Sequence, residues 1–480
     1  LSPPMLSQFH SREQADRWAA TEFAKVFAAA AVDYDHTLPP EPTTYAASLS
    51  DKSSEAAEWK LARDEEMESM RRFEVYKRVY ISQARGHQIL GARWVFKRKI
   101  GRDGKVSRYR ARLVVQGYRQ KPWDSFNPDE ISAPVGHKDS IRLMLSIAAA
   151  ENMHIHQADI KAAFLQAPLK EKIYVRAPQG YESRTASGEE EVLELSQAIY
   201  GLKQAGACFF DAAREHLLSL GFQSMVGDPC LYKRVDANGG VLIVCTYVDD
   251  FTFAVNDTSL ISTFMAELRQ RFVIDDGEGG PISYILGIAV DQDLEKGTVH
   301  LCMELAITKL CRHILTDEEL ARAVTVDSPM STTPLQSRSD NESESSSNFD
   351  YLSAVGSILH VANCVRPDVS YSVGYLARFA ANPGPQHVKA AKRVLLYLFN
   401  TRTLGITYYR ESRQEKNRPI LFEGAKHPLD DGSNLTQVFV DSDYAGDESR
   451  RSTQGCVVLM NSGPIAWFSV LGKTVALSTC

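Results

Sequence analysis

The sequence has few of the features that mark disulfide-bonded, zinc-binding or membrane proteins. Its eight cysteines are spread over 480 residues, and no CxxC or CxxH spacing occurs among them. This argues against a zinc finger or a disulfide scaffold, and reduced thiols are typical of a cytosolic or nuclear protein. The longest uncharged stretch, 452–472, contains Asn461-Ser462-Gly463-Pro464, which favours two short strands around a turn over a membrane span.

The chain opens without a charged-then-apolar signal segment, and its first residue, Leu1, is not an initiator. We therefore expect a fragment of a longer product. A composition of 44% hydrophobic and 24% charged residues excludes global disorder, and the length suggests about three domains.

Charge is unevenly distributed along the chain. The net charge of −6 by itself argues against a simple nucleic-acid binder. Residues 93–121, however, carry eleven basic residues and one acid, a net charge of +10, so that the rest of the chain sums to −16. A concentrated basic segment on an acidic chain is typical of a contact with a polyanion.

Hydrophobic periodicity predicts a mixture of helices and strands. We expect helices over 55–73, 138–150, 205–220, 350–364 and 386–400, and strands over 92–100, 107–116, 154–164, 241–248 and 251–255. Residues 1–50 are expected to be a loosely ordered lead-in. The Ser-rich, acidic segment 337–350 has too few apolar residues to offset the entropy of folding, which predicts a linker. A strand-rich unit is expected from 404 to 480.

One candidate site consists of carboxylates. Asp249-Asp250 is expected as a two-residue turn between two very apolar strands, and Asp159 is expected at the end of another strand. Most Asp-Asp pairs are simple turns. Adjacent carboxylates nevertheless repel and raise each other's pKa unless a cation compensates, and phosphoryl transfer uses carboxylates from separate elements around two metal ions. A metal site and a plain turn both remain open on this evidence.

Several ordered motifs resemble the reverse transcriptase region of copia-type retrotransposon polyproteins. The resemblance covers about residues 40 to 480. The segments that carry it, in chain order, are Trp94-Val-Phe-Lys-Arg-Lys, Tyr109-Arg-Ala-Arg, Asp159-Ile-Lys-Ala-Ala-Phe, Ile199-Tyr-Gly-Leu-Lys-Gln, Asp228-Pro-Cys-Leu-Tyr, Tyr247-Val-Asp-Asp, Tyr284-Ile-Leu-Gly-Ile, Arg366-Pro-Asp-Val-Ser-Tyr and Val440-Asp-Ser-Asp-Tyr.

The resemblance implies an α+β, right-hand polymerase fold. Fingers and palm would occupy 51–336, a helical thumb or connection region 351–403, and a truncated RNase H-like α/β unit 404–480. The activity implied is RNA-directed DNA synthesis from deoxynucleotides on a primed RNA or DNA template, with Mg²⁺, or alternatively Mn²⁺, as cofactor. The resemblance leaves the oligomeric state open.

The resemblance also assigns roles to residues. Asp159, Asp249 and Asp250 would be catalytic, with Asp159 and Asp249 as the metal ligands. Phe164 would exclude a ribose 2′-hydroxyl, and Arg112, with Arg110 as second choice, would reach the triphosphate. The floor of the template and nucleotide pocket would be formed by Tyr200, Gly201 and Gln204.

Downstream, Asp441 would be the first metal ligand of the RNase H-like unit. The next acid of that site follows the motif represented here by Leu477-Ser478-Thr479, and the chain ends at Cys480. We therefore expect no RNase H activity from this chain.

Two other interpretations remain open. The chain could be a decayed element that binds nucleic acid through its basic segment without catalysis, or another two-metal phosphotransferase. The absence of a Gly-rich Lys-Ser/Thr loop from the sequence weighs against an ATPase of the P-loop kind.

Overall fold

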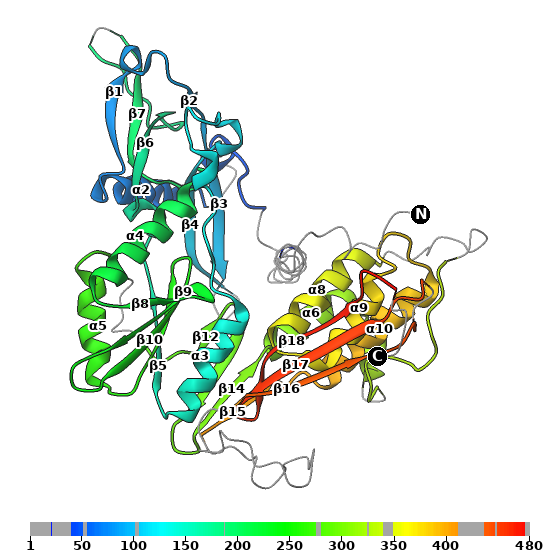
Figure 1. Ribbon diagram of the computed structural model, residues 1–480. Helices are drawn as coiled ribbons and strands as arrows, with labels where there is room; N and C mark the ends of the chain where they lie inside the picture. The colour runs from blue at the N-terminus through cyan, green and yellow to red at the C-terminus, as the bar shows by residue number, and fades with distance from the viewer. Residues whose placement is uncertain are drawn as a thin grey trace. The chain divides into compact units, whose positions relative to one another are not determined.

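The structure is a computed structural model. It describes residue 21 and residues 40–50, 55–100, 105–186, 188–274, 280–323, 326–338, 349–410, 436–446 and 449–475. The fold is a mixture of helices and strands, in which runs of strands and runs of helices follow one another along the chain (Figure 1). Contacts divide the chain into two compact units, each assembled from separate stretches. The first unit comprises Leu1–Asp33, Lys138–Ile155 and Pro281–Cys480, and the second comprises Tyr34–His137 and His156–Gly280.

The second unit contains a β-hairpin that packs on a helix. Strands β3 (Ala92–Ile100) and β4 (Val106–Val115) pair antiparallel, as the sequence predicts, and helix α2 (Ala56–Arg72) lies against them. The Trp59 ring meets Phe96 and Tyr109 edge-on, at centroid distances of 5.4 and 4.7 Å. The predicted turn at 101–104 lies outside the described residues. Beside the hairpin is a four-stranded sheet of order β1 (Tyr76–Tyr80), β7 (Glu191–Gln197), β6 (Pro168–Arg176) and β2 (Ile89–Leu90).

A five-stranded sheet forms the other half of this unit. Its order is β5 (His154–Asp159), β11 (Asp250–Val255), β10 (Val241–Tyr247), β9 (Asp228–Val235) and β8 (Gln223–Met225). Helix α5 (Ser259–Arg269) packs on the sheet through Phe264, which meets Phe253 of β11 at 5.0 Å between centroids. Helix α4 (Ala205–Ser219) joins α5 where His216 Nε2 lies 3.0 Å from the carbonyl oxygen of Glu267.

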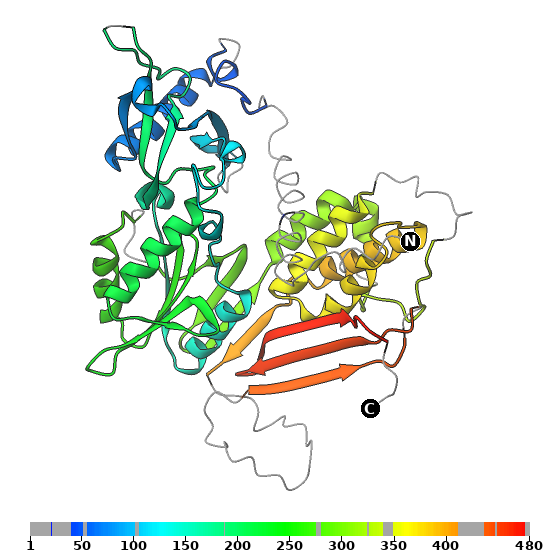
Figure 2. The ribbon, with the colours of Figure 1, turned by 45° about the horizontal axis from the view of Figure 1, so that its top comes forward.

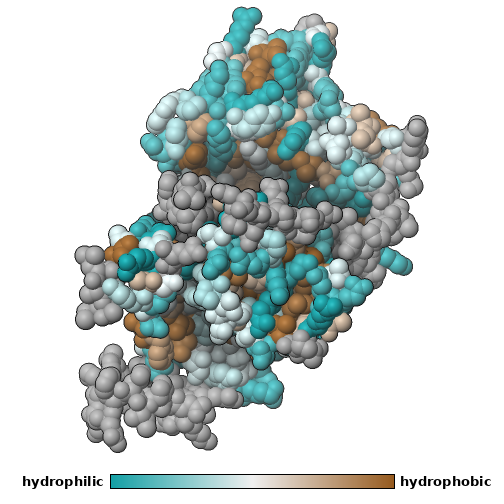
Figure 3. Space-filling view, turned by 90° about the vertical axis from the view of Figure 1, so that its right-hand side faces the viewer, coloured by the Kyte–Doolittle hydropathy of each residue, from teal (hydrophilic) through white to brown (hydrophobic). Residues whose placement is uncertain are grey.

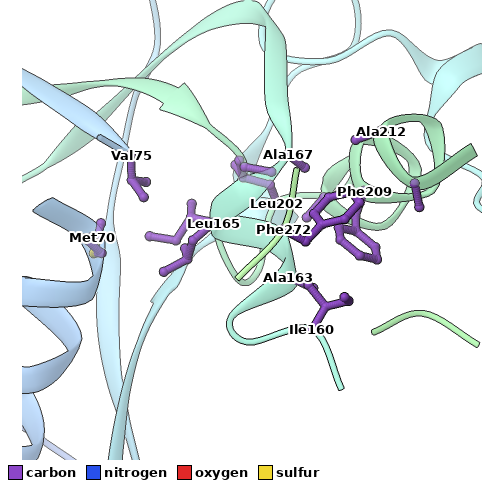
Figure 4. Packing of buried hydrophobic residues seen from close by; sticks show 14 of the residues in the cluster. Met70, Val75, Ile160, Ala163, Leu165, Ala167, Leu202, Phe209, Ala212 and Phe272 are labelled. Atoms are coloured by element: carbon purple, nitrogen blue, oxygen red, sulfur yellow. The ribbon is translucent and has the colours of Figure 1, made fainter. Parts of the chain in front are cut away.

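One large buried cluster connects these elements of the second unit. Fully buried Leu165 lies between Met70 and Val75 on one side and Phe209 and Phe272 on the other (Figure 4). Burying a leucine of this kind contributes about 1.5–3 kcal/mol. Because Leu165 belongs to the short 3₁₀ segment Ala163–Gln166, the same packing fixes the position of its neighbour Phe164.

The first unit combines helices with two sheets (Figure 2). One sheet has the order β12 (Tyr284–Ile285), β13 (Ile288–Asp293), β14 (Thr298–Cys302) and β15 (Ile406–Tyr409), and the other consists of β16 (Thr436–Ser442), β17 (Thr453–Met460) and β18 (Gly463–Leu471). The helices are α3 (Lys138–Ala150), α6 (Glu304–Ile314), α7 (Asp317–Ala321), α8 (Tyr351–Cys364), α9 (Ser370–Ala377) and α10 (Pro385–Asn400).

A buried arginine joins three of these elements. Arg142 of α3 is 1% exposed and donates to the carbonyl oxygens of Asn363, Cys364 and Ile465 at 2.8–2.9 Å. Its guanidinium also lies 4.0 Å from the ring centroid of Trp467. The charge is thus placed where main-chain oxygens and an aromatic face replace water.

Most predicted elements agree with the structure. Helix α3 has the predicted bounds, and β17 and β18 meet at Asn461 and Ser462, both with positive φ. None of the helices in the described part of the chain combines the length and apolar character that crossing a bilayer needs. The face drawn in Figure 3 carries small hydrophobic patches separated by hydrophilic residues.

Several expectations need correction. The strand expected over 154–164 ends at Asp159, and Phe164 lies in a 3₁₀ segment. The strand near residue 404, β15, pairs with β14 and does not belong to the sheet of the three C-terminal strands. Helices α5, α6, α7 and α9 were not predicted. Residues 40–50 of the expected loose lead-in pack on α2, where buried Ser48 accepts a hydrogen bond from Arg63. The predicted domain boundaries stay a prediction, and residues 339–348 of the predicted linker lie outside the described residues.

Candidate active site

The three candidate carboxylates gather where neighbouring strands begin and end. Asp159 is the last residue of β5, and Asp250 is the first residue of the adjacent strand β11. The amide of Ile160 donates to the carbonyl oxygen of Asp249 at 3.1 Å, which ties the two segments together. The sheet therefore brings Asp159, Asp249 and Asp250 to one edge.

The turn between β10 and β11 differs from the prediction by one residue. Tyr247 pairs with Asp250, so the two turn residues are Val248 and Asp249, not Asp249 and Asp250. Val248 has a φ of +55°, a conformation that is rarely adopted by β-branched residues and that stores strain. This shift places Asp249 in the turn and Asp250 at the head of the strand.

The local field at this edge is negative. The pKa of Asp250 is raised to about 6 by partial burial and by the charges of Asp249 and Asp159. A site of this charge attracts cations, and carboxylate oxygens are the ligands that Mg²⁺ prefers.

No group of three or more His, Cys, Asp or Glu side chains within the described residues forms a ready-made metal cage. Mg²⁺ sites in polymerases are usually built from one or two carboxylates together with substrate phosphates and water. The carboxylate oxygens of Asp159 and Asp249 fit such a site, in which substrate phosphates and water would provide the other metal ligands.

Beside the carboxylates, three predicted residues form a continuous stack. The guanidinium of Arg112 lies 4.5 Å from the ring centroid of Tyr200, and the Phe164 ring meets Tyr200 at 5.3 Å with an interplanar angle of 68°. Burial raises the pKa of Tyr200. The charge of Arg112 lowers this pKa, and the charge of Asp249 raises it. Tyr200 therefore lies in the field of both Arg112 and Asp249.

Close backbone contacts position Tyr200. The amide of Val115 donates to its carbonyl oxygen at 2.8 Å. The next residue, Gly201, has a φ of +93°, and a Cβ there would lie 2.2 Å from the carbonyl oxygen of Val115. Glycine is therefore required at this position for the turn to rest against β4.

Gln204 is placed behind the turn. It is 2% exposed, and its amide nitrogen donates to the carbonyl oxygen of Ser125 at 3.0 Å while its oxygen accepts from Gln120 at 3.0 Å. The side chain of Gln204 thus stabilises the turn from inside the fold, and it does not form part of the same surface as Tyr200 and Gly201.

The free edge of β4 is covered by a carboxylate that sequence reasoning did not select. Glu66 of α2 accepts a hydrogen bond from the amide of Leu113 at 3.1 Å. Burial raises the pKa of Glu66, although this hydrogen bond and the charges of Arg112 and Arg110 act in the opposite direction. Glu66 therefore sits in the field of both arginines proposed to reach the triphosphate.

The basic segment is partly neutralised within the fold. Arg98 forms a bidentate pair with Glu55, both side chains being 7% exposed. Burial raises the pKa of Glu55, but hydrogen bonds from Arg98 and Tyr109 outweigh it and hold that pKa below its usual value. Arg98 is therefore a structural residue and not part of a polyanion contact.

Comparison with known proteins identifies the family of the chain. A family model described as Reverse transcriptase (RNA-dependent DNA polymerase) matches residues 73–332. The chain belongs to the reverse transcriptase family. The predicted resemblance to copia-type elements is thereby confirmed.

Relatives of this reverse transcriptase chain come from transposons. It is 33% identical over 424 residues to the Retrovirus-related Pol polyprotein from transposon TNT 1-94 of Nicotiana tabacum, which covers 87% of the chain and 29% of that protein. The corresponding protein from transposon RE1 of Arabidopsis thaliana is 32% identical over 393 residues, 82% of the chain and 24% of that protein. The Transposon Ty1-H Gag-Pol polyprotein of Saccharomyces cerevisiae is 24% identical over 403 residues, 82% of the chain and 20% of that protein. The chain thus spans less than a third of the length of these relatives.

The remaining predicted residue lies apart from the reverse transcriptase match. Asp441 is an exposed residue of β16 in the first unit, and its carboxylate accepts from the amide of Ser442 at 2.9 Å. The segment 477–479, expected to precede the next acid, lies outside the described residues.

Proposed function

We propose that the chain is a reverse transcriptase fragment that extends a primer with deoxynucleotides on an RNA or DNA template. One observation carries the proposal. In a member of this family, three carboxylates lie at the ends of adjacent strands, and the segment that follows Asp159 places Phe164 against the ring of Tyr200, on which Arg112 lies. This combination suits phosphoryl transfer, in which positioning and charge neutralisation provide most of the catalysis.

The carboxylates would hold the metal. Asp159 and Asp249 would bind Mg²⁺ or Mn²⁺, and Asp250, at the head of its strand, would support the negative field that attracts them. When bound, the ions would supply Lewis-acid activation of the primer 3′-hydroxyl and neutralise the leaving pyrophosphate. The pairing of Tyr247 with Asp250 holds the turn, with its left-handed Val248, in the conformation that contains Asp249.

The stack would select and orient the nucleotide. Arg112 would donate to the triphosphate from its position on Tyr200, with Arg110 as the second donor on the same strand face. Phe164 is held by its own segment and by Tyr200, so its ring would remain in place against a ribose 2′-hydroxyl. Gly201 allows this floor to lie against β4, and Gln204 supports it from behind.

The finer architecture is also part of the proposal. The hairpin β3–β4 with α2 would correspond to fingers and the five-stranded sheet to a palm. Residues 351–403 would form a thumb or connection region, and 404–480 an RNase H-like unit. None of the seven described cysteines is in a disulfide, which suits an intracellular, reducing location.

Primer extension tests the function. The purified chain should extend a DNA primer on an RNA template with the four dNTPs and Mg²⁺, should stop when EDTA is added, and should discriminate against the four rNTPs. Binding of the primed template without extension under these conditions would instead support the decayed element that only binds nucleic acid.

A further inference from the structure

A short loop after β4 exposes two large aromatic side chains. Residues 117–126 form this loop, in which Tyr118 is 74% and Trp123 is 73% exposed. Trp59 and Trp94 of the same unit are 0% and 5% exposed, so a tryptophan and a tyrosine left mostly in water in one short loop are distinctive. Exposed aromatic side chains of this kind are typical of binding surfaces.

The loop holds these rings on a firm backbone. The Ser125 hydroxyl accepts from the amide of Lys121 at 3.0 Å, and the amide of Trp123 donates to the carbonyl oxygen of Phe126 at 2.8 Å. Trp123 has a φ of +63°, which is strained for a bulky residue. Strain of this kind persists where the surrounding structure fixes it, and it clusters at functional sites.

The loop is joined to the turn that carries Tyr200. The side chain of Gln120, 4% exposed, accepts from the amide of Lys203 at 2.9 Å and donates to Gln204 at 3.0 Å. A Cβ on Gly117 would lie 1.9 Å from the carbonyl oxygen of Gly201. A ligand on the loop would therefore be adjacent to the nucleotide floor.

Cations are interleaved with the aromatic rings. The guanidinium of Arg119 lies 5.8 Å from the ring centroid of Tyr118, and Lys203 Nζ lies 4.3 Å from that of Phe126. Lys121 adds a third positive charge, against a single acid in the loop, Asp124. Aromatic faces for bases together with cations for phosphates are the features that bind single-stranded nucleic acid without reading its sequence.

We propose that the 117–126 loop is a stacking platform for unpaired bases of the template strand next to the polymerase site. Tyr118 and Trp123 would stack on bases, while Arg119 and Lys121 would neutralise phosphates. This inference rests on the proposed function, because the template is the single strand that a primed polymerase site must receive. The exposed rings are separated by charged residues, which suits an alternating chain of bases and phosphates better than an apolar protein surface.

Binding measurements with matched substrates test the platform. Anisotropy would compare a primed template carrying a 12-nucleotide 5′ template overhang with a blunt duplex of the same paired sequence, for the parent chain, Tyr118→Ala and Trp123→Ala. Each alanine variant should weaken overhang binding about 5- to 150-fold and leave blunt-duplex binding unchanged. Tyr118→Phe and Trp123→Phe should retain affinity. Tyr80→Ala, which removes another exposed tyrosine of the same unit, is the matched control, and thermal melting checks that each variant folds.

Salt dependence adds a second readout. Arg119→Gln and Lys121→Gln should each reduce the slope of log affinity against log salt by about 0.7 on the overhang. Unchanged overhang affinity in both alanine variants, or an equal loss on the blunt duplex, would overturn the platform even if primer extension proceeds. Selective loss on the overhang in a chain that extends no primer would support the platform while contradicting the polymerase.

Discussion

The guanidinium of Arg112 lies 4.5 Å from the ring centroid of Tyr200, and Phe164 packs edge-on against the same ring. A residue from β4, one from the 199–204 turn and one from the segment after β5 thus form one surface. The aromatic face holds the guanidinium in a fixed position before substrate binds, which reduces the entropy lost when it donates to a phosphate.

Arg112→Gln should lower kcat/KM for dNTPs by about 10- to 150-fold, because a hydrogen bond to a charged group contributes roughly 1.5–3 kcal/mol. Arg112→Lys should recover part of this loss, since it keeps the charge but not the planar group that stacks on Tyr200. Steady-state incorporation of a single nucleotide measures both. Arg184→Gln, in an exposed loop of the same unit, is the control, and an equal effect of that variant would contradict a specific role for Arg112.

Gly201→Ala should destabilise the second unit by several kcal/mol. The new Cβ would lie 2.2 Å from the carbonyl oxygen of Val115 at a φ of +93°, and the left-handed conformation alone costs about 1–2 kcal/mol. Urea denaturation provides the measurement. Gly239→Ala is a matched control because Gly239 has a φ of +83° and open space around its Cβ position. It should show the conformational cost without the clash, so equal losses in the two variants would be evidence against close packing of the turn on β4.

Glu66→Gln should change the pH dependence of stability. Burial raises the pKa of Glu66, so between its unfolded value and the raised value the folded chain binds more protons than the unfolded chain. The free energy of unfolding therefore falls as pH rises through that window and remains lower above it. The glutamine of the variant could still accept the Leu113 amide and carries no charge. We expect equal stability of parent and variant in acid and a more stable variant at pH 8.

Glu66→Ala separates charge from hydrogen bonding. It leaves the Leu113 amide without its acceptor and should cost about 1–3 kcal/mol at every pH where the chain folds. Urea midpoints at pH 5 and pH 8 measure all three proteins. A glutamine variant that is less stable than the parent at pH 8 would contradict the burial argument.

Local patterns predicted much of the fold. Helix α3 and the hairpins β3–β4, β10–β11 and β17–β18 follow from apolar periodicity and turn residues close in sequence. The predicted turn between β10 and β11 was wrong by one residue. Asp-Asp is a stronger turn signal than Val-Asp, but the register of the two strands is set by the packing of the whole strands. A single-residue error of this kind decides which aspartate lies in the turn.

Pairings between distant residues could not be predicted from one sequence. Glu55 and Arg98 are 43 residues apart, and Glu66 and the amide of Leu113 are 47 apart. On sequence alone these glutamates resemble the polar face of a helix, and Arg98 resembles its basic neighbours. Their roles arise because α2 packs across the hairpin, a contact that composition does not encode.

The assignment of the catalytic site is tested by comparing Asp249→Asn with Asp211→Asn in Mg²⁺-dependent primer extension. Asp211 is a half-exposed carboxylate of α4 in the same unit, so its variant controls for the loss of one negative charge. We expect Asp249→Asn to lower the extension rate on the order of a thousandfold or more, with primer–template binding retained, and Asp211→Asn to extend the primer like the parent. Extension by Asp249→Asn at the parental rate would contradict the assignment of the catalytic site.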